Sequence, residues 1–472
     1  MEFYGREKEI KELKEIAVLA KSRLQFLRIT GRRRVGKTAL IQHFLAKNPN
    51  SLYFFVSRKK EEILVDEFFD ILRSKIPLLE SVHVRTLEHF LSLLFTLFKD
   101  RSLWIVFDEF QNFQQVNPAF FSMLQKHWDK QNASCKGSLV AIGSIQSMMK
   151  NLFESQKEPL FGRLTKKMLV SPFDIRTLAK ICRAHHQMDS GRLLHFFAIF
   201  GGVARYYDLL SSNALFDKPV EEILTKLVID SNGILNSEGK DLIIQEFGKS
   251  HPLYFSILEA IARGNAEPIK IADICGIDKN SIGKYLDELV NAYDLLEKRT
   301  PFSKPKQRLG RYYIRDPFLK FWFRYVHRYR SLIEIQNTDE IVKKIMDDFP
   351  SYLGFVFEEL IKQCLTELQK RGRLDFKFDE IGSFWDRAPH EIDIVAYEEK
   401  SQTLYVGECK LNSQKLNLDA LKQKLQGVKI SKPIKKVKYL LFYLKKNKGF
   451  KPIEGNGEVL VYSLDDLLAK LK

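Results

Sequence analysis

The sequence predicts an α/β protein of several domains, built around a parallel sheet. An apolar strand at residues 24–30 leads into a glycine-rich loop, and helical periodicity follows directly after the loop. Further apolar segments that read as strands occur at residues 51–57, 103–107, 138–144 and 166–170. Near the end of the chain, residues 391–397 and 403–410 read as two adjacent strands joined by a polar turn. A second sheet is therefore expected there.

The length and composition are those of a globular protein. A chain of 472 residues is long enough for about three domains. Its content of 45% hydrophobic and 29% charged residues excludes a disordered, collagen-like or coiled-coil chain. The chain starts with charged residues and no signal peptide, and its longest apolar run, residues 90–98, is about half of a membrane-spanning helix. We expect a soluble, cytoplasmic protein without a membrane partner, and five scattered cysteines suit that reducing compartment.

Positive charge is concentrated in two segments. The formal net charge is +17, from 76 Lys and Arg against 59 Asp and Glu. Residues 293–330 contribute +8 and residues 401–451 contribute +11, so the rest of the chain is close to neutral. Local basic surfaces favour polyanionic partners, and DNA is the partner we expect. The aromatic residues within 311–330 are expected to be mostly core, with a basic rim.

The loop after the first strand has the spacing of a phosphate-binding motif. It reads G-x4-G-K-T, with Gly31, Gly36, Lys37 and Thr38 at the fixed positions. The glycines let backbone N–H groups surround phosphates, and the lysine reaches the β- and γ-phosphates. The threonine hydroxyl is a ligand for Mg²⁺. The residues expected to bind the nucleotide here are Gly31, Arg32, Arg33, Arg34, Val35, Gly36, Lys37, Thr38 and Ala39.

Two acidic residues follow the strand at 103–107, which is the Walker B pattern. Asp108 is placed to hold Mg²⁺, and Glu109 to orient and deprotonate the attacking water. Ser144 ends the strand at 138–144, where its side chain could contact the γ-phosphate or that water. Arg163, in the segment PLFGR, could act as an arginine finger on a neighbouring subunit of a homo-oligomer. A plain surface arginine is the alternative.

Five segments together resemble the archaeal-type ATPase family, whose P-loop module is related to the STAND and AAA+ NTPases. They are FYGREKEIKEL, GRRRVGKT, WIVFDEF, AIGSIQSMM and PLFGR. The resemblance implies ATP as the nucleotide, a five-stranded parallel sheet with an added strand between the Walker strands, and Arg6 near the base. The family also carries a GGxP signature in a helical lid. Here the string FGGVARYY has Gly202 as the second glycine and Ala204 at the proline position.

The middle of the chain is expected to be helical. Helical periodicity dominates from Asp174 to about Leu210, which predicts a small lid. Three short helices and two strands around a basic loop then follow the winged-helix pattern. Within this pattern, the start of the second helix of a helix-turn-helix is expected to contact the DNA groove through Lys279, Asn280, Ser281 and Lys284. The predicted tip of the wing carries Lys304, Lys306, Arg308 and Arg311. The alternative is a packing or nucleotide-sensing domain that does not touch DNA.

The last part of the chain carries a second set of acids. Alternation places Glu408 and Lys410 on the same face of a strand, and a hairpin register can set Asp393 beside them. Two carboxylates that hold Mg²⁺, with a lysine that helps orient or activate water, are what a metal-dependent phosphodiesterase needs. An amphipathic helix before these strands adds Glu358.

This C-terminal segment resembles the PD-(D/E)XK nuclease superfamily. The string IGSFWDRAPHEIDIVAY followed by LYVGECK is similar to the domain that is often fused to archaeal-type ATPases. The resemblance matches Asp393, Glu408 and Lys410 to the core motif, and Glu358 to the helix acid. Glu391 and Glu359 are alternative acids, and the sequence leaves each choice open.

The expected organisation has four parts. They are a P-loop ATPase core (1–173), a helical lid (174–245), a winged-helix domain with a basic wing (246–345) and a restriction-endonuclease-like α/β domain (346–472). The expected function is ATP hydrolysis that controls a DNA-binding, Mg²⁺-dependent nuclease module. The alternative is a STAND-like signalling switch that oligomerises with nucleotide state and whose C-terminal domain binds a partner without cleaving nucleic acid.

Overall fold

The structure is a computed structural model that describes most of the chain. The described residues are 2–79, 82–187, 189–248, 251–303, 309–386, 390–446 and 457–471. They form two compact units. The N-terminal unit consists of residues 2–172 with 203–205, and the C-terminal unit of residues 173–202 with the chain from 206 onward. The finer division into lid, winged-helix and nuclease-like domains stays a prediction.

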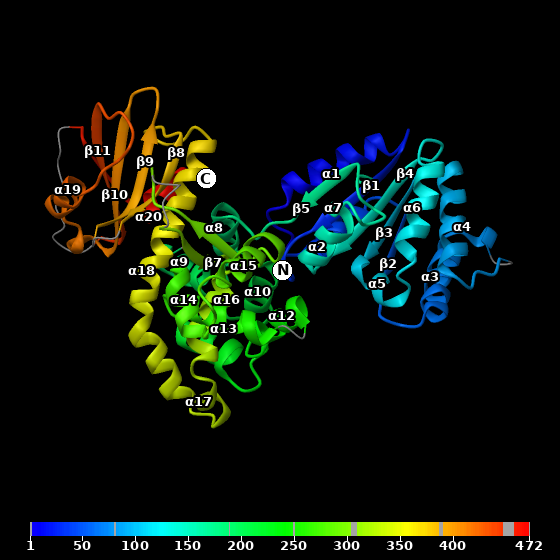
Figure 1. The fold of residues 1–472 in the computed structure, drawn as a ribbon, viewed down its shortest axis with the longest axis horizontal. Coiled ribbons are helices and arrows are strands. Elements are labelled where there is room, and N and C mark those ends of the chain that lie inside the picture. Colours follow the sequence, from blue (N-terminus) through cyan, green and yellow to red (C-terminus); the bar gives the residue numbers. More distant parts are fainter. Residues whose placement is uncertain are drawn as a thin grey trace. The chain divides into compact units, whose positions relative to one another are not determined.

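A five-stranded parallel sheet forms the centre of the N-terminal unit (Figure 1). Its strands are β1 (Leu24–Thr30), β2 (Ser51–Phe55), β3 (Leu103–Asp108), β4 (Gly137–Gly143) and β5 (Lys166–Leu169). They lie in the order β2-β3-β4-β1-β5, and every neighbouring pair is parallel. β1, β3 and β4 are buried along their whole length, as expected for strands covered on both faces. The prediction of a parallel sheet, with one strand added between the two Walker strands, is confirmed.

Helices flank this sheet in the N-terminal unit. They are α1 (Glu7–Leu19), α2 (Lys37–Leu45), α3 (Glu61–Lys75), α4 (Leu87–Asp100), α5 (Phe113–Val116), α6 (Phe120–Gln131) and α7 (Gln146–Glu154), with 3-10 turns at Pro77–Leu79 and Phe110–Asn112. α2 starts at Lys37, directly after the glycine-rich loop. The apolar run at residues 90–98 lies within α4. Within the described part of the chain, no helix is long and apolar enough to cross a membrane.

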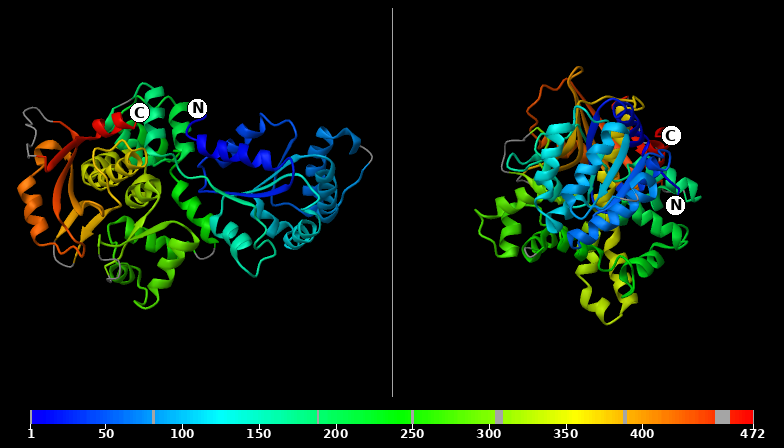
Figure 2. Two further views of the ribbon diagram at one scale, coloured as in Figure 1. Left: turned by 90° about the horizontal axis from the view of Figure 1, so that it is seen from above. Right: turned by 90° about the vertical axis from the view of Figure 1, so that its right-hand side faces the viewer.

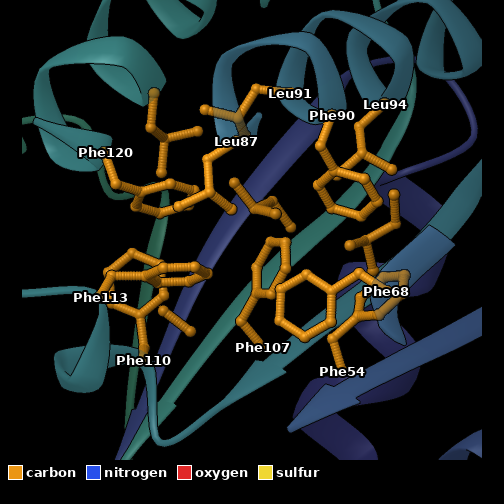
Figure 3. Packing of buried hydrophobic residues seen from close by; sticks show 14 of the residues in the cluster. Phe54, Phe68, Leu87, Phe90, Leu91, Leu94, Phe107, Phe110, Phe113 and Phe120 are labelled. Atoms are coloured by element: carbon orange, nitrogen blue, oxygen red, sulfur yellow. The ribbon is translucent and has the colours of Figure 1, made fainter. Parts of the chain in front are cut away.

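Phenylalanine side chains fill the space between the sheet and helices α3, α4 and α6 (Figure 3). Phe54 of β2 stacks on Phe107 of β3 with ring centroids 5.4 Å apart, and Phe68 of α3 lies 5.9 Å from Phe107. Phe113 and Phe120 stack with ring centroids 3.6 Å apart. Phe107 is fully buried at the centre of this cluster, one residue before Asp108. The cluster therefore fixes the end of β3, where the first acidic residue of the site begins.

Phe107→Ala should lower the free energy of unfolding of the N-terminal unit by about 3–5 kcal/mol, because it leaves a cavity among rings that cannot fully collapse. Urea unfolding followed by circular dichroism measures this loss. The matched control is Phe55→Ala, since Phe55 is 54% exposed at the end of the neighbouring strand and should cost less than about 1 kcal/mol. Equal losses in the two variants would contradict the assigned core.

The C-terminal unit begins with helices (Figure 2). Its helices are α8 (Ile175–Ala184), α9 (Ser190–Phe200), α10 (Ala204–Ser212), α11 (Val220–Leu224), α12 (Glu238–Phe247), α13 (His251–Ala262), α14 (Pro268–Cys275), α15 (Ile282–Asp287), α16 (Pro317–Phe321), α17 (Arg330–Glu334), α18 (Thr338–Lys370), α19 (Leu418–Gln426) and α20 (Leu464–Lys470). Short π-helical segments occur at Thr225–Ile229, Glu288–Ala292 and Trp322–His327. The aromatic residues of the last segment are buried, as the sequence predicted.

The predicted order of three helices and a two-stranded hairpin is present. α13, α14 and α15 are followed by the antiparallel strands β6 (Leu296–Arg299) and β7 (Arg311–Ile314). The boundary expected between residues 345 and 346 falls inside a helix, because α18 runs without a break from Thr338 to Lys370. One continuous helix therefore joins the predicted winged-helix and nuclease-like regions.

A second five-stranded sheet lies in the C-terminal unit. Its strands are β8 (Glu380–Trp385), β9 (Glu391–Glu398), β10 (Thr403–Asn412), β11 (Lys436–Lys445) and β12 (Val459–Ser463). The order is β12-β11-β10-β9-β8; β8, β9 and β10 are antiparallel to one another, whereas β10, β11 and β12 are parallel. α18 packs against β9 and β10, so the predicted helix acid and the predicted strand acids come from adjoining elements (Figures 1 and 2).

Candidate functional site

The glycine-rich loop adopts a conformation that needs its glycines. Gly31 and Gly36 have φ angles of 154° and 95°, and a Cβ atom on Gly31 would lie 2.4 Å from the carbonyl oxygen of Val170. The buried Lys37 ammonium donates to the carbonyl oxygens of Gly31 and Arg32, at 2.9 Å each. The loop therefore curls around its own lysine, with the N-terminus of α2 directly behind it.

Two neighbouring segments of the N-terminal unit hold this loop from outside. The guanidinium of Arg6, only 4% exposed, donates to the carbonyl oxygens of Val35 at 2.7 Å and Ser171 at 2.8 Å. The backbone N–H of Arg205 donates to the carbonyl oxygen of Arg34 at 3.2 Å. Arg6 thus supports the loop backbone, and its contact with the base stays a prediction.

The family's lid signature also reaches the loop. A Cβ atom on Gly36 would lie 3.6 Å from the Cβ of Ala204, an ordinary contact distance. Ala204 therefore packs beside the loop at the position where the family has proline. Gly202 belongs to the other unit, and its carbonyl oxygen accepts a hydrogen bond from the Phe173 N–H at 2.7 Å.

Thr38, at the start of α2, and Asp108, at the end of β3, are joined by a hydrogen bond between their side chains. The Thr38 hydroxyl donates to Oδ2 of Asp108 at 2.8 Å, and the Tyr53 hydroxyl donates to the same oxygen at 2.6 Å. Burial and this hydrogen bond raise the pKa of Tyr53, so the phenol stays protonated and a donor. Tyr53 was missed by the sequence reasoning, because its place opposite Val106, two residues before Asp108, follows from the pairing of β2 with β3.

Glu109 is held in an uncommon backbone conformation. Its φ angle of 56° is in the left-handed region, which non-glycine residues rarely adopt outside turns and functional sites. The Ser144 hydroxyl is 2.9 Å from both carboxylate oxygens of Glu109, and the Gln111 amide also donates to this carboxylate. Ser144 thus orients Glu109 here, and its predicted contact with phosphate or water stays a prediction.

Arg163 does not project freely from the N-terminal unit. Its guanidinium makes a bidentate pair with the carboxylate of Asp129 in α6, at 2.8 and 2.7 Å. A role in a neighbouring subunit requires that this pair breaks, so the arginine-finger assignment stays a prediction.

The residues of this first site fit a nucleotide with Mg²⁺. The loop conformation requires glycine at position 31, where a side chain would clash with the Val170 backbone, and Lys37 supplies a cation within the loop. Thr38 and Asp108 supply adjacent hard oxygen donors, the kind Mg²⁺ prefers. Glu109 lies one residue beyond this oxygen pair, with its carboxylate oriented by Ser144.

A second polar cluster lies in the C-terminal sheet. Asp393 of β9 accepts a hydrogen bond from the backbone N–H of Cys409 at 2.8 Å, which confirms the predicted hairpin that brings β9 beside β10. Oε1 of Glu408 pairs with the ammonium groups of Lys410 at 3.1 Å and Lys424 at 3.0 Å. Lys424, from α19, was not predicted. It lies 16 residues after Glu408, and no local sequence pattern relates the two residues.

The two pairs of alternative acids occupy different environments. Glu359 pairs with Arg299 at 2.5 Å and with Lys362 at 3.1 Å, and these cations hold its pKa low despite burial. Burial and the charge of Asp393 raise the pKa of Glu358 to about 8. The exposed Glu391 pairs with Arg311 at 3.0 Å. The geometry therefore favours Glu358 and Asp393 over Glu359 and Glu391 as the acids of one site.

The second cluster is only partly arranged as a metal site. Among the described residues, no group of three or more His, Cys, Asp or Glu side chains could hold a metal ion. Oε2 of Glu408 is nevertheless buried without a hydrogen-bond partner, and burial raises the pKa of Asp393. A buried carboxylate oxygen without a partner is costly, and a cation beside it would remove that cost.

The hairpin β6–β7 packs against the edge of the C-terminal sheet. Phe302 belongs to the sheet's hydrophobic cluster and donates its backbone N–H to the carbonyl oxygen of Ser383 at 2.8 Å. The indole N–H of Trp385 donates to the carbonyl oxygen of Leu309 at 2.9 Å. Arg311, expected at the wing tip, instead lies over Trp385. Lys304, Lys306 and Arg308 lie outside the described residues.

The fold and the first site define the class of protein. A parallel sheet of this strand order, a glycine-rich loop closed around a lysine, and an acidic pair at the end of β3 are those of a P-loop NTPase. Residues 3–193 match the family described as "ATPase domain predominantly from Archaea". The whole chain belongs to one family with the uncharacterized protein MJECL04 of Methanocaldococcus jannaschii, which is 30% identical over 466 residues, 98% of this chain and 99% of that protein.

Solved structures agree with this fold. The Walker-type ATPase PABY2304 of Pyrococcus abyssi is similar at 20% identity and a TM-score of 0.50, covering 68% of this chain and 96% of its own. The ORC2 protein of Aeropyrum pernix is similar at 14% identity and a TM-score of 0.44, covering 73% of this chain and 96% of its own. The match of residues 3–193 to the archaeal ATPase-domain family confirms the predicted resemblance for this part of the chain.

The C-terminal region matches a second family. Residues 322–423 match "Archaea bacterial proteins of unknown function". The match includes Glu358, Asp393, Glu408 and Lys410, but the description names no activity. The nuclease resemblance therefore stays a proposal.

Glu358→Gln should stabilise the C-terminal unit increasingly as pH rises. The wild-type carboxyl, with its pKa raised from 4.5 to about 8, keeps its proton in the folded state and loses it in the unfolded state. Stability of the wild type relative to the variant should therefore fall between about pH 4.5 and about pH 8, and level off above that range. Urea unfolding in EDTA at several pH values measures this difference. A pH-independent difference would mean that Glu358 is not buried against Asp393.

Proposed function

We propose that this chain is an ATP-hydrolysing protein whose nucleotide state controls a C-terminal, nucleic-acid-directed module with a metal-dependent phosphodiesterase site. The observation that carries the ATPase half is the hydrogen bond between Thr38 and Asp108, 2.8 Å long, beside a loop closed around Lys37. The C-terminal half rests on the cluster of Asp393, Glu408 and Lys410 and on the neighbouring Glu358.

Each residue of the first site has a defined task in ATP hydrolysis. Lys37 exchanges its two loop carbonyls for phosphate oxygens and neutralises negative charge on the β- and γ-phosphates. Thr38 and Asp108 would hold Mg²⁺, which supplies electrostatic stabilisation of the phosphate oxygens when bound. Glu109 accepts the proton of the attacking water, and Ser144 holds its carboxylate in place.

Lys37→Ala should weaken ATP binding at least about 30-fold, because a buried cation is removed from beside the phosphates. Glu109→Gln should keep ATP binding but lower kcat by about 10²–10⁴-fold, because the water loses its base. Calorimetry and phosphate release measure the two effects.

The control for both variants is Lys47→Ala, an exposed lysine just after the same helix, which should change neither quantity. Unchanged ATP affinity in Lys37→Ala would refute the assigned phosphate site. Full turnover in Glu109→Gln would assign the base elsewhere.

The C-terminal unit has the order of elements that the nuclease proposal needs. A helix with Glu358, three antiparallel strands with Asp393 and Glu408, a second helix and a strand parallel to β10 follow one another along the chain. Asp393 and Glu408 would hold the metal, and Lys410 would help orient or activate water. The basic segment of residues 401–451, which contains Glu408 and Lys410 and follows Asp393 in sequence, suits a phosphate backbone.

Asp393→Ala should lower DNA cleavage at least about 100-fold without changing ATP turnover, because a proposed metal-binding carboxylate is lost. The assay is gel analysis of single- and double-stranded DNA with Mg²⁺ or Mn²⁺, with and without ATP. Glu391→Gln is the matched control, two residues away on β9, and it should cleave like the wild type. A variant Asp393→Ala that still cleaves would place the metal elsewhere.

One specific observation favours the alternative of a signalling switch. The backbone of Arg205 donates to the phosphate-binding loop at Arg34, and α10, which starts at Ala204, continues into the C-terminal unit from Tyr206. A change of loop conformation with nucleotide state therefore acts directly on the first turn of a helix shared by both units. The same connection also serves the nuclease proposal, because ATP control of the C-terminal unit needs such a path.

DNA contact is proposed through exposed polar residues at the start of α15. Asn280, Ser281 and Lys284 are exposed there, whereas Lys279 pairs with Asp273 at 3.1 Å. The described part of the wing hairpin packs on the C-terminal sheet, which favours α15 over that part of the hairpin as the groove contact. A homo-oligomer with Arg163 acting in trans is part of the same proposal.

A further inference from the structure

A cavity of about 970 Å³ lies in the C-terminal unit beside the second cluster. Its walls come from α18, the hairpin β6–β7, α16 and the sheet strands β8 and β9. Both Glu358 and Asp393 line it, so the cavity opens onto the proposed phosphodiesterase site. Its volume is that of a site for a small ligand or a few units of a chain.

One face of α18 supplies the chemistry of this wall. Phe355, Glu358, Glu359 and Lys362 all line the cavity, and their spacing of three, four and seven residues places them on one side of the helix. Glu359 and Lys362 are paired with each other. Glu358, with its raised pKa, and Phe355 are therefore the groups on this face that remain for a ligand.

Phe355 is an aromatic side chain exposed toward this cavity. It is 56% exposed, although most phenylalanine residues of the chain that the structure describes are buried. Tyr313 and Trp385 also line the cavity and lie under Arg299 and Arg311, whereas Phe355 has no ring or cation contact with the residues that the structure describes. An accessible ring on a cavity wall is a stacking surface for an unpaired base.

Lys320 lines the cavity from α16, and burial lowers the pKa of its ammonium to about 8. Among the described residues this ammonium has no hydrogen bond or ion pair, and it lies 5.4 Å from the ring centroid of Tyr352. The neighbouring cations Arg299, Arg311 and Arg324 are paired with carboxylates at 2.5, 3.0 and 2.8 Å. Among the described residues, Lys298 and Lys320 are the lining cations without an ion pair; Lys320 is the less exposed of the two and is the one assigned to the phosphate.

We propose that this cavity receives an unpaired nucleic-acid strand, with a base stacked on Phe355 and a phosphate paired with Lys320. A cavity of about 970 Å³ is about 10 Å across. A duplex is broader than that, since its major groove alone is about 12 Å wide, whereas a short unpaired segment fits. The inference names the substrate class of the proposed nuclease, a single strand or an unpaired end, and it rests on that proposed function.

The test is fluorescence anisotropy with the full chain in EDTA and without ATP, using a labelled oligonucleotide of about 10 nucleotides. Wild type should bind the unpaired strand more tightly than the duplex of the same sequence. Phe355→Ala should weaken binding of the strand by about 5- to 150-fold, the effect of losing one stacked base. Lys320→Gln should weaken it too and reduce the salt dependence by about one phosphate contact, whereas Lys320→Arg should retain binding.

The matched control is Ile335→Ala, because Ile335 is 70% exposed and does not line the cavity. It should bind like the wild type. The inference is overturned if duplex binds as tightly as the strand, if Phe355→Ala and Lys320→Gln bind normally, or if a mononucleotide competes as well as the oligonucleotide.

Cleavage of the same oligonucleotide is followed separately with Mg²⁺ or Mn²⁺, so that the two failures can be told apart. Binding that depends on Phe355 without any cleavage would support the strand-binding site and contradict the nuclease proposal. Cleavage that is equally fast in wild type and Phe355→Ala would keep the nuclease and remove the strand site.

Discussion

The hydrogen bond from Thr38 to Asp108 depends on the order of the parallel strands. The loop after β1 and the acids after β3 leave the same edge of the sheet, because parallel strands end at one edge, and β4 separates them by one strand. The fully buried phenylalanine cluster holds β3 at its end, and Arg6 holds the loop from the other side. The loop after β1 and the end of β3 are thereby held in place. Tyr53 adds a side-chain hydrogen bond to Asp108, and Ser144 adds one to Glu109.

The C-terminal unit uses a different arrangement, in which two acids come from a hairpin and one from a helix. The antiparallel pairing of β9 and β10 brings Asp393 to the backbone of Cys409, while α18 brings Glu358 to the same cluster. Burial then makes these carboxylates resist ionisation, and Glu408 is compensated by two lysines. Under the proposed function, a cation and the phosphates of a ligand would replace the present ion pairs of this cluster.

Local patterns predicted the parts of the structure that local geometry controls. The strands of the first sheet, the loop with Gly31 and Lys37, and the hairpin of β9 and β10 follow from apolar runs, glycine spacing and alternation. Contacts between segments far apart in the chain were not predictable in this way. Lys424 reaches Glu408 through folding of α19 onto the sheet, and Phe302 joins the sheet's core from the hairpin. The continuous helix α18 was not predicted, because the sequence reasoning recognised an amphipathic helix only in its second half, after the boundary placed at residue 345.

The most direct test of this account measures single-turnover ATP hydrolysis by the wild type and by Asp108→Asn over a range of Mg²⁺ concentrations. Asparagine keeps the size of the side chain and can still accept the Thr38 and Tyr53 hydrogen bonds, but it removes the charge that would hold the metal. The account predicts Mg²⁺-dependent hydrolysis by the wild type and a loss of about 10- to 100-fold or more in Asp108→Asn, with a higher Mg²⁺ requirement. Equal rates and equal Mg²⁺ dependence in the two proteins would contradict it.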